Sequence, residues 1–488
     1  MTRVRTGLAW TAVLGTAIIG ASAAFAADPI VAPVATQVVA MEAEVSQVGL
    51  TYEEYVTEQQ RLNAWLMGEL PAGAMDVPIR IELAQDDHAV IGTSAVDEPL
   101  RVGVVKPVEP AVTLTGLDLN RSVKDARGSA GGAIRTTADG GTVWARAVTS
   151  GGAGGIRVHL TDFNLPANAE LYVFGLQGEA FGPYTGRGLN GDGQFWTDSI
   201  LADTAVLLLH VPRAVSGKDL RGMTMTINEV GHIGIEFVGG LTQTAAFCGN
   251  PNCIVDASCH NGTPADPAKN AVAKMEWISG PYIYTCSGGL LNDSNPSQNN
   301  FFLTANHCVN KNNTAQNVQF YWRFATSSCN GACPSNSGWP YKTIGSSLKV
   351  TGRRGDFTLL QLNSNPPSGS VFLGWTTTPV ANTNGYDLWR VSNPNFGPQV
   401  YSRHDVDTGA VTCSGWPRGE RIYSNDALGG IDGGSSGSPV VNASSQVVGQ
   451  LSGTCGYNPN DPCDSASNST VDGAFAYYYN SVRPYLAP

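Results

Sequence analysis

The 488-residue chain is predicted to be all-β and to consist of two separately folded halves. It has 57 glycines and only 14% charged residues, a composition more typical of strand- and loop-rich proteins than of helical ones. From about residue 77 onward, apolar side chains alternate with a period of two or form short runs between turns. All ten cysteines lie at or after Cys248, so disulfides would cross-link the second half alone.

The first 26 residues have the features of a secretory signal peptide. Arg3 and Arg5 precede an apolar run at residues 8–21, and small residues then lead to Ala26, after which we expect cleavage. The run is short for a membrane anchor, and no other stretch is long and apolar enough to cross a bilayer. We therefore expect a secreted protein that has no membrane partner once the signal is removed.

Residues 27–247 are predicted to form a β-sandwich-like domain preceded by a helix. The helix would span about residues 50–70, with Thr51 as its cap and two glutamates in its first turn. Many short strands separated by Gly, Pro and Asn turns indicate the sandwich. These strands are expected at residues 79–83, 143–148, 156–160, 171–174 and 205–211.

Residues 248–488 again have the pattern of strands joined by Gly, Asn, Ser and Pro loops, and could form two packed small barrels. A short helix is expected near the end, over residues 474–486. The clearest strands are expected at residues 282–284, 289–291, 301–304, 318–322, 357–362 and 447–451.

Charge excludes one class of partner. The net charge is −11, of which residues 1–247 carry −10 and residues 248–488 carry −1. Because neither half is basic, we expect no nucleic-acid partner.

Three side chains have settings suited to nucleophilic catalysis. Ser436 lies in the glycine-rich turn at residues 434–439, where backbone N–H groups can approach a ligand. His307 follows an apolar strand and precedes Cys308, which can pin its loop, with Cys286 as a natural partner. Asp356 heads another apolar strand, where a histidine could satisfy its partly buried carboxylate.

Residues 433–437 also fit the G-x-S-x-G nucleophile elbow, with Ser435 as the nucleophile. That fold needs its histidine after the serine, and the last histidine is His404, so this alternative is excluded.

Metal sites are disfavoured as well. Cys248, Cys253 and Cys259, or Cys329 with Cys333, lack a histidine pair at zinc-finger spacing. A calcium site at Asp461, Asp464 and Asp472 is less favoured than a solvated turn. We expect no metal and no cofactor.

The motifs at residues 304–308, 356–360 and 434–439, in this order, resemble those of trypsin-like serine proteases. Among these, the resemblance is closest to bacterial secreted lysyl endopeptidases, through the Cys253–Cys259 spacing and residues 285–290 and 449–451. The resemblance implies that residues 248–488 form a chymotrypsin-like double β-barrel. It also implies that residues 27–247 are a propeptide.

The same resemblance implies roles for individual residues. Ser436 would be the nucleophile, His307 the base and Asp356 the group that orients it. The backbone N–H groups of Gly434 and Ser436 would form the oxyanion hole. The substrate pocket would be built from residues 430–436 and 452–454, closed by residues 469–475, and would include Gly430, Asp432, Ser452 and Gly453.

Three disulfides are implied by the family, and two more pair the cysteines that have no counterpart there. The implied pairs are Cys253–Cys455, Cys259–Cys329 and Cys286–Cys308. The additional pairs are Cys248–Cys463 and Cys333–Cys413. The first is expected because Cys248 and Cys463 each lie near one end of the Cys253–Cys455 bridge.

Two departures from the family shape the expected function. Ser435 stands where trypsin has the aspartate that receives a new N-terminal amine, so we expect activation by removal of the prodomain. Lysyl endopeptidases carry a histidine at the position of Ser452 and an aspartate close to Ser469 or Thr470. Neither is present here, and no lysine or arginine lies between Arg221 and Lys269, so we expect a non-basic preference.

The sequence thus predicts a secreted serine endopeptidase, made as a proenzyme, whose partners are protein or peptide substrates and its own propeptide. Two alternatives stay open. Residues 27–247 could be a permanently retained binding module, or the chain could be a protease-like binding protein without activity.

Overall fold

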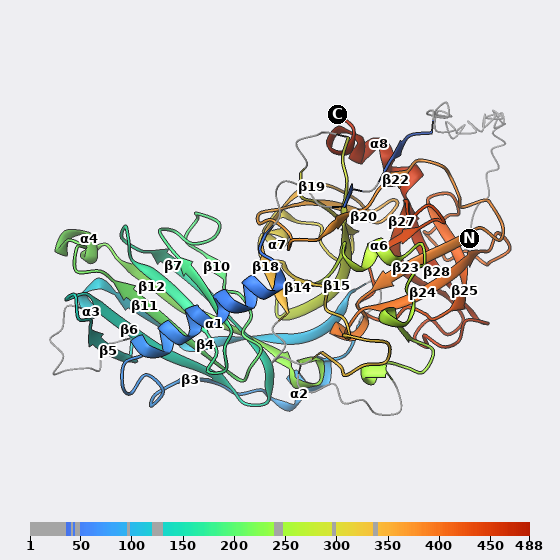
Figure 1. Ribbon diagram of the computed structural model, residues 1–488. Helices are drawn as coiled ribbons and strands as arrows, with labels where there is room; N and C mark the ends of the chain where they lie inside the picture. Colours follow the sequence, from blue (N-terminus) through green and yellow to red (C-terminus); the bar gives the residue numbers. More distant parts are fainter. Residues whose placement is uncertain are drawn as a thin grey trace, which may run out of the picture. The chain divides into compact units, whose positions relative to one another are not determined.

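The structure is a computed structural model in which strands predominate (Figure 1), as predicted. It describes residues 36–488 except 41, 44–48, 95–97, 120–129, 239–246, 295–298 and 335–339. The expected signal peptide, residues 1–26, lies outside the described residues. Residues 37–488 form one compact unit.

The N-terminal domain is a β-sandwich, as predicted. Alternating apolar residues of its two sheets face each other, so that Trp144 and Leu207 of one sheet share a core with Val158 and Ile227 of the other. The first sheet has the order β3–β6–β11–β8–β9 with β5 beside β6, and the second β10–β7–β12–β4. The strands are β3 (Ile79–Ile81), β4 (Leu100–Thr115), β5 (Ala133–Thr136), β6 (Thr142–Ser150), β7 (Ala153–Asn164), β8 (Glu170–Phe174), β9 (Ala180–Tyr184), β10 (Phe195–Trp196), β11 (Thr204–Val211) and β12 (Thr224–Gly234).

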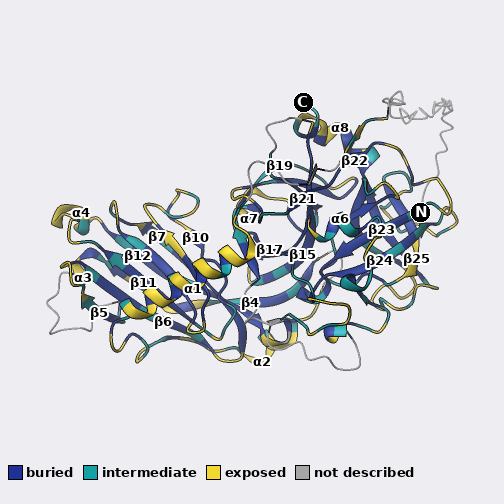
Figure 2. Ribbon diagram, viewed as in Figure 1, coloured by how far each residue is buried: buried dark blue, intermediate teal, exposed yellow. Residues whose placement is uncertain are grey.

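Helix α1 (Tyr52–Glu69) lies on the outer face of the first sheet. Thr51 and Glu54 form a reciprocal capping box at its start, as the sequence indicates. Leu66 is fully buried against Tyr172 and Phe174, while much of the opposite face of the helix is exposed (Figure 2). The other helices of this domain are short: α2 (Gln85–Val90), α3 (Gly116–Leu119), α4 (Gly217–Arg221) and α5 (Ile235–Val238).

The C-terminal domain begins with a curved sheet that branches at β15, in the orders β15–β14–β17–β18 and β15–β16–β20–β19. Its core includes Leu290, Phe302 and Leu359. The elements are β14 (Val272–Ser279), β15 (Tyr282–Leu291), β16 (Phe301–Ala305), β17 (Gln319–Trp322), β18 (Tyr341–Ile344), β19 (Ser346–Gly352) and β20 (Phe357–Leu362), with α6 (Asp266–Lys269) and α7 (Asn312–Ala315) in the loops.

The remaining strands close into a six-stranded barrel, because β27 pairs with both β26 and β28 around the ring β26–β23–β24–β25–β28–β27. The chymotrypsin-like arrangement predicted for residues 248–488 is therefore present. The strands are β23 (Asp387–Ser392), β24 (Val400–Val406), β25 (Arg421–Leu428), β26 (Pro439–Val441), β27 (Val447–Gly456) and β28 (Asn468–Ala474). The C-terminal helix α8 (Phe475–Leu486) follows β28. Its Tyr478 ring stacks on Phe357 of β20, in the curved sheet of the same domain.

Strand β4 belongs to both domains. Most of its length pairs with β12 of the sandwich, but its first residues pair with β15, with Leu100 opposite Thr285. Two short strands near the N-terminus pair with strands of the C-terminal domain. These are β1 (Val38–Val39) beside β22 (Trp375–Thr376) and β2 (Glu42–Ala43) beside β21 (Val371–Phe372), while β13 (Val255–Asp256) pairs with β24.

All ten cysteines form disulfides, and the pairing differs from expectation. Cys259–Cys329 and Cys286–Cys308 are as predicted. Three predicted pairs are wrong: Cys253–Cys455, Cys248–Cys463 and Cys333–Cys413. The observed pairs are Cys248–Cys333, Cys253–Cys463 and Cys413–Cys455.

The physical reason lies in the order of the barrel strands. The loop before β25 carries Cys413, and β25 and β27 both flank β28. Cys413 and Cys455 therefore meet in one small apolar cluster with Tyr423 and Val471. This leaves Cys253 for Cys463, which lies in the loop that follows β27.

Peptide mapping of the unreduced protein should recover a Cys413–Cys455 cross-link and a Cys253–Cys463 cross-link, because these cysteines are bonded in the folded chain. Mass spectrometry before and after reduction identifies them. Recovery of a Cys253–Cys455 peptide from the folded protein would contradict the pairing described here.

Candidate active site

His307 and Asp356 are brought together by the pairing of β16 with β20. Ala305 lies opposite Phe357 in this ladder, so the residues just beyond both strand ends face each other. His307 Nδ1 lies 2.9 Å from Asp356 Oδ2, and the His307 backbone N–H donates to Oδ1 at 3.0 Å. The carboxylate therefore fixes the ring and favours a proton on Nδ1, which leaves Nε2 as the acceptor.

The second barrel and the C-terminal helix hold the turn that carries Asp356. Gln450 of β27 donates through Nε2 to the carbonyl oxygens of Gly355, at 3.0 Å, and of Asp356, at 2.8 Å. Gln450 in turn accepts a hydrogen bond of 2.5 Å from the hydroxyl of Tyr478 on α8. Asp356 itself is only 7% exposed. Its position thus depends on both parts of the C-terminal domain.

Ser436 is placed against the same region by Gly437. A β-carbon on Gly437 would lie 2.2 Å from Thr304 Oγ1 and 2.8 Å from the backbone nitrogen of Ala305, so only glycine fits, at a φ of +82°. The Ser436 carbonyl accepts from the Ser287 N–H at 2.8 Å. Ser287 follows Cys286, whose disulfide to Cys308 reaches the loop of His307. The serine turn therefore lies against β16 and near the disulfide that reaches the loop of His307.

The backbone of the serine turn leaves two N–H groups free. The N–H groups of Gly433, Ser435, Gly437 and Ser438 donate to oxygens of Asp432, Asp432, Leu451 and Ser435, respectively. Among the described residues, those of Gly434 and Ser436 have no acceptor. These two are the groups that the sequence assigns to an oxyanion hole, and their being unpartnered leaves them available for one.

Ser435 and Ser436 differ in their surroundings. The Ser435 side chain is fully buried, and its Oγ accepts from the Ser392 hydroxyl at 3.0 Å and from the Asp432 N–H at 3.3 Å. Ser436 is partly exposed. Ser435 thus stabilises the turn, and only Ser436 of this pair is accessible to a substrate.

The candidate pocket residues have unequal roles. The carboxylate of Asp432 accepts from the Gly433 N–H at 2.7 Å and from Asn395 Nδ2 at 2.9 Å, so both of its oxygens are used within the turn. Asp432 is therefore a structural residue of the loop.

Gly453 leaves room for Trp416, whose ring would lie 3.6 Å from a β-carbon at this position.

Gly430 and Ser452 are both buried, and the Ser452 hydroxyl has no partner among the described residues. Beside Gly430 lies a carboxylate that the sequence analysis did not identify, that of Asp426. It accepts hydrogen bonds from His404 and Thr470. No local motif marks Asp426, because its partners lie on two other strands.

A buried ion pair binds the serine turn at Ser438. Arg390 Nη1 donates to the Ser438 carbonyl at 2.9 Å and to the Ser438 hydroxyl at 3.1 Å, and its Nη2 lies 2.5 Å from Asp472 Oδ1. Both charged side chains are fully buried. Asp472 thus lies in β28 and not in a solvated loop with Asp461 and Asp464, which excludes it from the calcium alternative.

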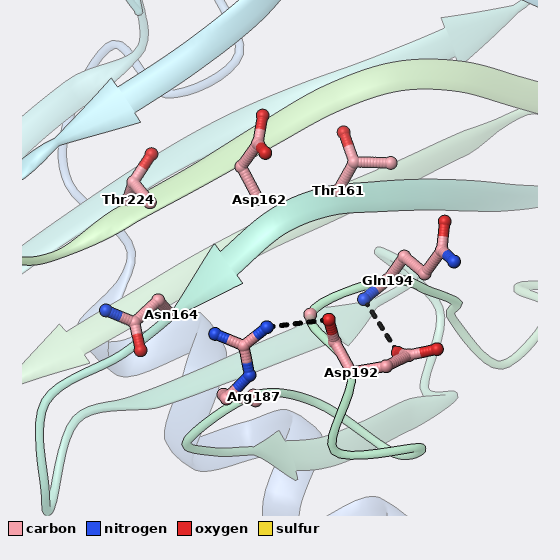
Figure 3. A pocket seen from close by; sticks show the side chains of 8 residues that line it. Thr161, Asp162, Asn164, Arg187, Asp192, Gln194 and Thr224 are labelled. Atoms are coloured by element: carbon pink, nitrogen blue, oxygen red, sulfur yellow. Dashed lines mark hydrogen bonds between the residues drawn. The ribbon is translucent and has the colours of Figure 1, made fainter.

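The N-terminal domain has a polar hollow of about 410 Å³ of its own (Figure 3). Its lining groups mostly satisfy one another: Arg187 donates to the Asp192 carbonyl at 2.7 Å, and the Asp192 side chain accepts from the Gln194 N–H at 3.0 Å. The hollow is lined by Thr161, Asp162, Asn164, Arg187, Asp192, Gly193, Gln194 and Thr224.

Comparison with known proteins shows the family of the chain. The lysyl endopeptidase N-terminal domain model matches residues 82–234, and the lysyl endopeptidase C-terminal domain model matches residues 247–468. Lysyl endopeptidase of Pseudomonas aeruginosa is 30% identical over 405 residues, which cover 80% of this chain and 82% of that protein. The chain belongs to the lysyl endopeptidase family. It is thus a serine endopeptidase by family.

Weaker similarities also exist. Secreted RxLR effector protein 73 of Plasmopara viticola is 25% identical, covering 65% of this chain and 79% of that protein. The active form of a Mycobacterium tuberculosis protease, Rv3671c, is 14% identical, covers 49% of this chain and 92% of its own, and has a TM-score of 0.33. Among the described residues, no helix combines the length and apolarity needed to cross a membrane.

Replacing Arg390 with methionine (Arg390→Met) should lower the stability of the C-terminal domain by about 3–5 kcal/mol, because Asp472 would be left buried without a counter-charge. The urea midpoint measures the loss. The control is Arg390→Met with Asp472→Leu, which removes both charges and should recover much of the stability. An unchanged midpoint in the single variant would show that the ion pair has no such role.

Proposed function

We propose that this chain is a secreted serine endopeptidase that cleaves peptide bonds through Ser436, His307 and Asp356 and is made as a latent proenzyme. The observation that carries the proposal is the serine turn. Ser436 is partly exposed, and two N–H groups of its turn have no acceptor among the described residues. The turn lies against the strand that leads to His307, which a buried carboxylate orients. Family membership supports the reaction class.

In this mechanism, His307 Nε2 accepts the proton of Ser436 Oγ as that oxygen attacks the peptide carbonyl. The oxyanion that forms accepts hydrogen bonds from the N–H groups of Gly434 and Ser436. His307 then protonates the leaving amine, and the acyl group stays on Ser436 as an ester. Water, deprotonated by His307, hydrolyses the ester. Asp356 stabilises the imidazolium during each proton transfer.

Replacing Ser436 with alanine (Ser436→Ala) should abolish labelling by a fluorophosphonate probe and lower kcat by about 10⁶-fold, because the nucleophile is lost. Ser435→Ala is the matched control: it removes a hydroxyl one residue away that is buried in the turn, and labelling should persist. Mass spectrometry of the labelled peptide locates the modified residue. A label on Ser435, or equal labelling of the Ser436 variant, would contradict the assignment and favour a protease-like binding protein.

Latency is supported by the path of β4. Leu100 lies opposite Thr285 and Arg101 opposite Tyr284, so β4 adds a strand to the edge of β15. That edge leads to the serine turn, since the Thr285 side chain would lie 3.3 Å from a β-carbon on Gly434. An extended peptide substrate would bind such an edge by the same backbone pairing.

The Leu100 side chain also lies close to Gly433, the residue before the serine turn. A β-carbon on Gly433 would lie 3.4–3.6 Å from three carbons of the Leu100 side chain. Leu100 is only 7% exposed, so the start of β4 covers the turn beside the two free N–H groups. While this strand is in place, the N-terminal domain occupies the approach to Ser436 along β15.

The remaining contact between the domains is both apolar and charged. A buried apolar cluster joins Val102 and Ile233 of the sandwich to Ile283 of the C-terminal domain. Arg157 Nη1 lies 3.3 Å from Glu276 Oε1, and Lys342 Nζ lies 2.7 Å from Glu179 Oε1, with all four side chains buried. The two domains are therefore held together by an apolar cluster and by buried ion pairs.

Replacing Leu100 with aspartate (Leu100→Asp) should increase fluorophosphonate labelling of the uncleaved chain about tenfold or more, because an unpaired carboxylate is costly to bury against Gly433. The measurement is the labelling rate of the full-length band on a gel. The control is Leu117→Asp, at a leucine that is 59% exposed, and it should label like the unmodified chain. Equal rates in all three proteins would argue against latency through β4.

A further inference from the structure

The turn that carries Asp356 has a backbone that needs support from outside. Gly355 and Asp356 have φ angles of +79° and +50°, so two successive residues lie in the left-handed region. Glycine adopts this region freely, whereas an aspartate there is strained. Such a conformation persists only where the surrounding structure holds it. The position of the Asp356 carboxylate therefore depends on the groups that bind this turn.

Gln450 of β27 provides two of these bonds. Its Nε2 donates to the carbonyl oxygen of Gly355 at 3.0 Å and to that of Asp356 at 2.8 Å. The Asp356 carbonyl also accepts from the N–H of Asn306, the residue before His307, at 3.1 Å. Gln450 is fully buried. One buried amide group thus binds both carbonyls of the left-handed turn, next to the loop of His307.

The hydroxyl of Tyr478 determines which way this amide faces. It donates to Gln450 Oε1 at 2.5 Å, and among the described residues no other group donates to that oxygen. Burial, together with the charges of Asp472 and Asp356, raises the pKa of Tyr478 well above its usual value, so the hydroxyl keeps its proton. If the amide turned over, its oxygen would face two carbonyl oxygens, and the buried O–H would lose its acceptor. The hydroxyl therefore keeps Nε2 directed at the turn.

Close packing holds Tyr478 and Gln450 against the turn. The Tyr478 ring stacks on Phe357, with ring centroids 4.2 Å apart, and a β-carbon on Gly355 would lie 3.0 Å from Tyr478 Cδ1. A β-carbon on Gly473 would lie 2.2 Å from Gln450 Nε2 and 1.9 Å from the Gly355 carbonyl oxygen. Glycine at these two positions lets helix α8, β27 and the turn meet without an intervening side chain.

We propose that Tyr478 is a positioning residue for catalysis: by fixing the Gln450 amide, it holds the turn from which Asp356 orients His307. The inference rests on the proposed endopeptidase function. Tyr478 is 2% exposed and Gln450 is fully buried, so both act on the reaction through Asp356 and not by binding the substrate. Tyr478 lies in the C-terminal helix, outside the three motifs around Ser436.

The test compares Tyr478→Phe with the unmodified secreted protein on peptide p-nitroanilides that carry lysine or leucine before the cleaved bond. The substitution removes one oxygen and keeps the stacked ring. We expect kcat to fall about tenfold while KM stays nearly unchanged, because the orientation of His307 is disturbed and the substrate contacts are not. Each rate is divided by the number of Ser436 sites that a fluorophosphonate labels at completion, so unfolded molecules do not count.

The matched control is Tyr479→Phe. It removes the hydroxyl of the next residue of α8, which donates to Gln37 and not to the Asp356 turn. Its kcat and KM should equal those of the unmodified protein. An equal loss of kcat in both variants would show that the helix as a whole, and not the Tyr478 hydroxyl, is responsible, and would overturn the assignment.

The pH dependence gives a readout that a merely structural role would not move. The acidic limb of kcat/KM reports protonation of His307 in the free enzyme. In Tyr478→Phe this limb should move to lower pH, because a carboxylate that is less well placed stabilises the imidazolium less. Proton NMR of the intact chain checks the same bond without catalysis: the downfield signal of the proton between His307 and Asp356 should broaden or move upfield.

A double variant tests whether the effect passes through Gln450. Gln450→Met removes the amide, so adding Tyr478→Phe should cause no further loss of kcat. Additive losses, or an unchanged kcat, pH limb and NMR signal in Tyr478→Phe, would show that Tyr478 has no such role while the endopeptidase function stands. If the unmodified secreted protein neither cleaves peptides nor labels at Ser436, the endopeptidase function itself fails, and this inference with it.

Discussion

The close approach of Gly437 to the backbone of Thr304 and Ala305 is the constraint on which the site depends. Because Gly437 has no side chain, the serine turn of the barrel can contact β16, the strand of the curved sheet that leads to His307. Any β-carbon there would collide with Thr304 Oγ1, so the turn would have to withdraw from the strand, and Ser436 with it. The Cys286–Cys308 disulfide then fixes the loop of His307. The hydrogen bonds from Gln450 fix the turn that carries Asp356.

Buried charge serves two different purposes in this chain. Arg390 and Asp472 lie within one barrel, and their bonds to Ser438 fix the backbone two residues beyond Ser436. Such pairs add little net stability but are costly to break singly, so they favour one arrangement of the turn. Arg157 and Glu276 lie across the two domains instead, where burial lasts only as long as the domains stay together. The first pair supports the position of the proposed nucleophile, and the second joins the two domains.

Local patterns in the sequence predict the strands and helix α1 with its Thr51 cap, and they mark the three motifs around Ser436. These features depend on neighbours within a few residues, which the sequence displays directly. The cysteine pairs that failed and the carboxylate of Asp426 depend on which strands adjoin in the closed barrel. Asp426 meets Thr470 only because β25 pairs with β28, and Cys413 meets Cys455 for the same reason. No spacing along the chain reveals such contacts, and the family pairing misled because Cys413 and Cys463 have no counterparts in it.

The proposed latency constrains how the protease is released. The stretch between Arg221 and Lys269 contains no lysine or arginine, so an enzyme that cleaves after basic residues finds no bond to cut there. Strand β4 meanwhile covers the approach to Ser436 in the intact chain. Ser435 also offers no carboxylate to a new N-terminus, because its hydroxyl is buried among Ser392 and Asp432. In the proposed proenzyme, activity therefore begins only when β4 leaves β15.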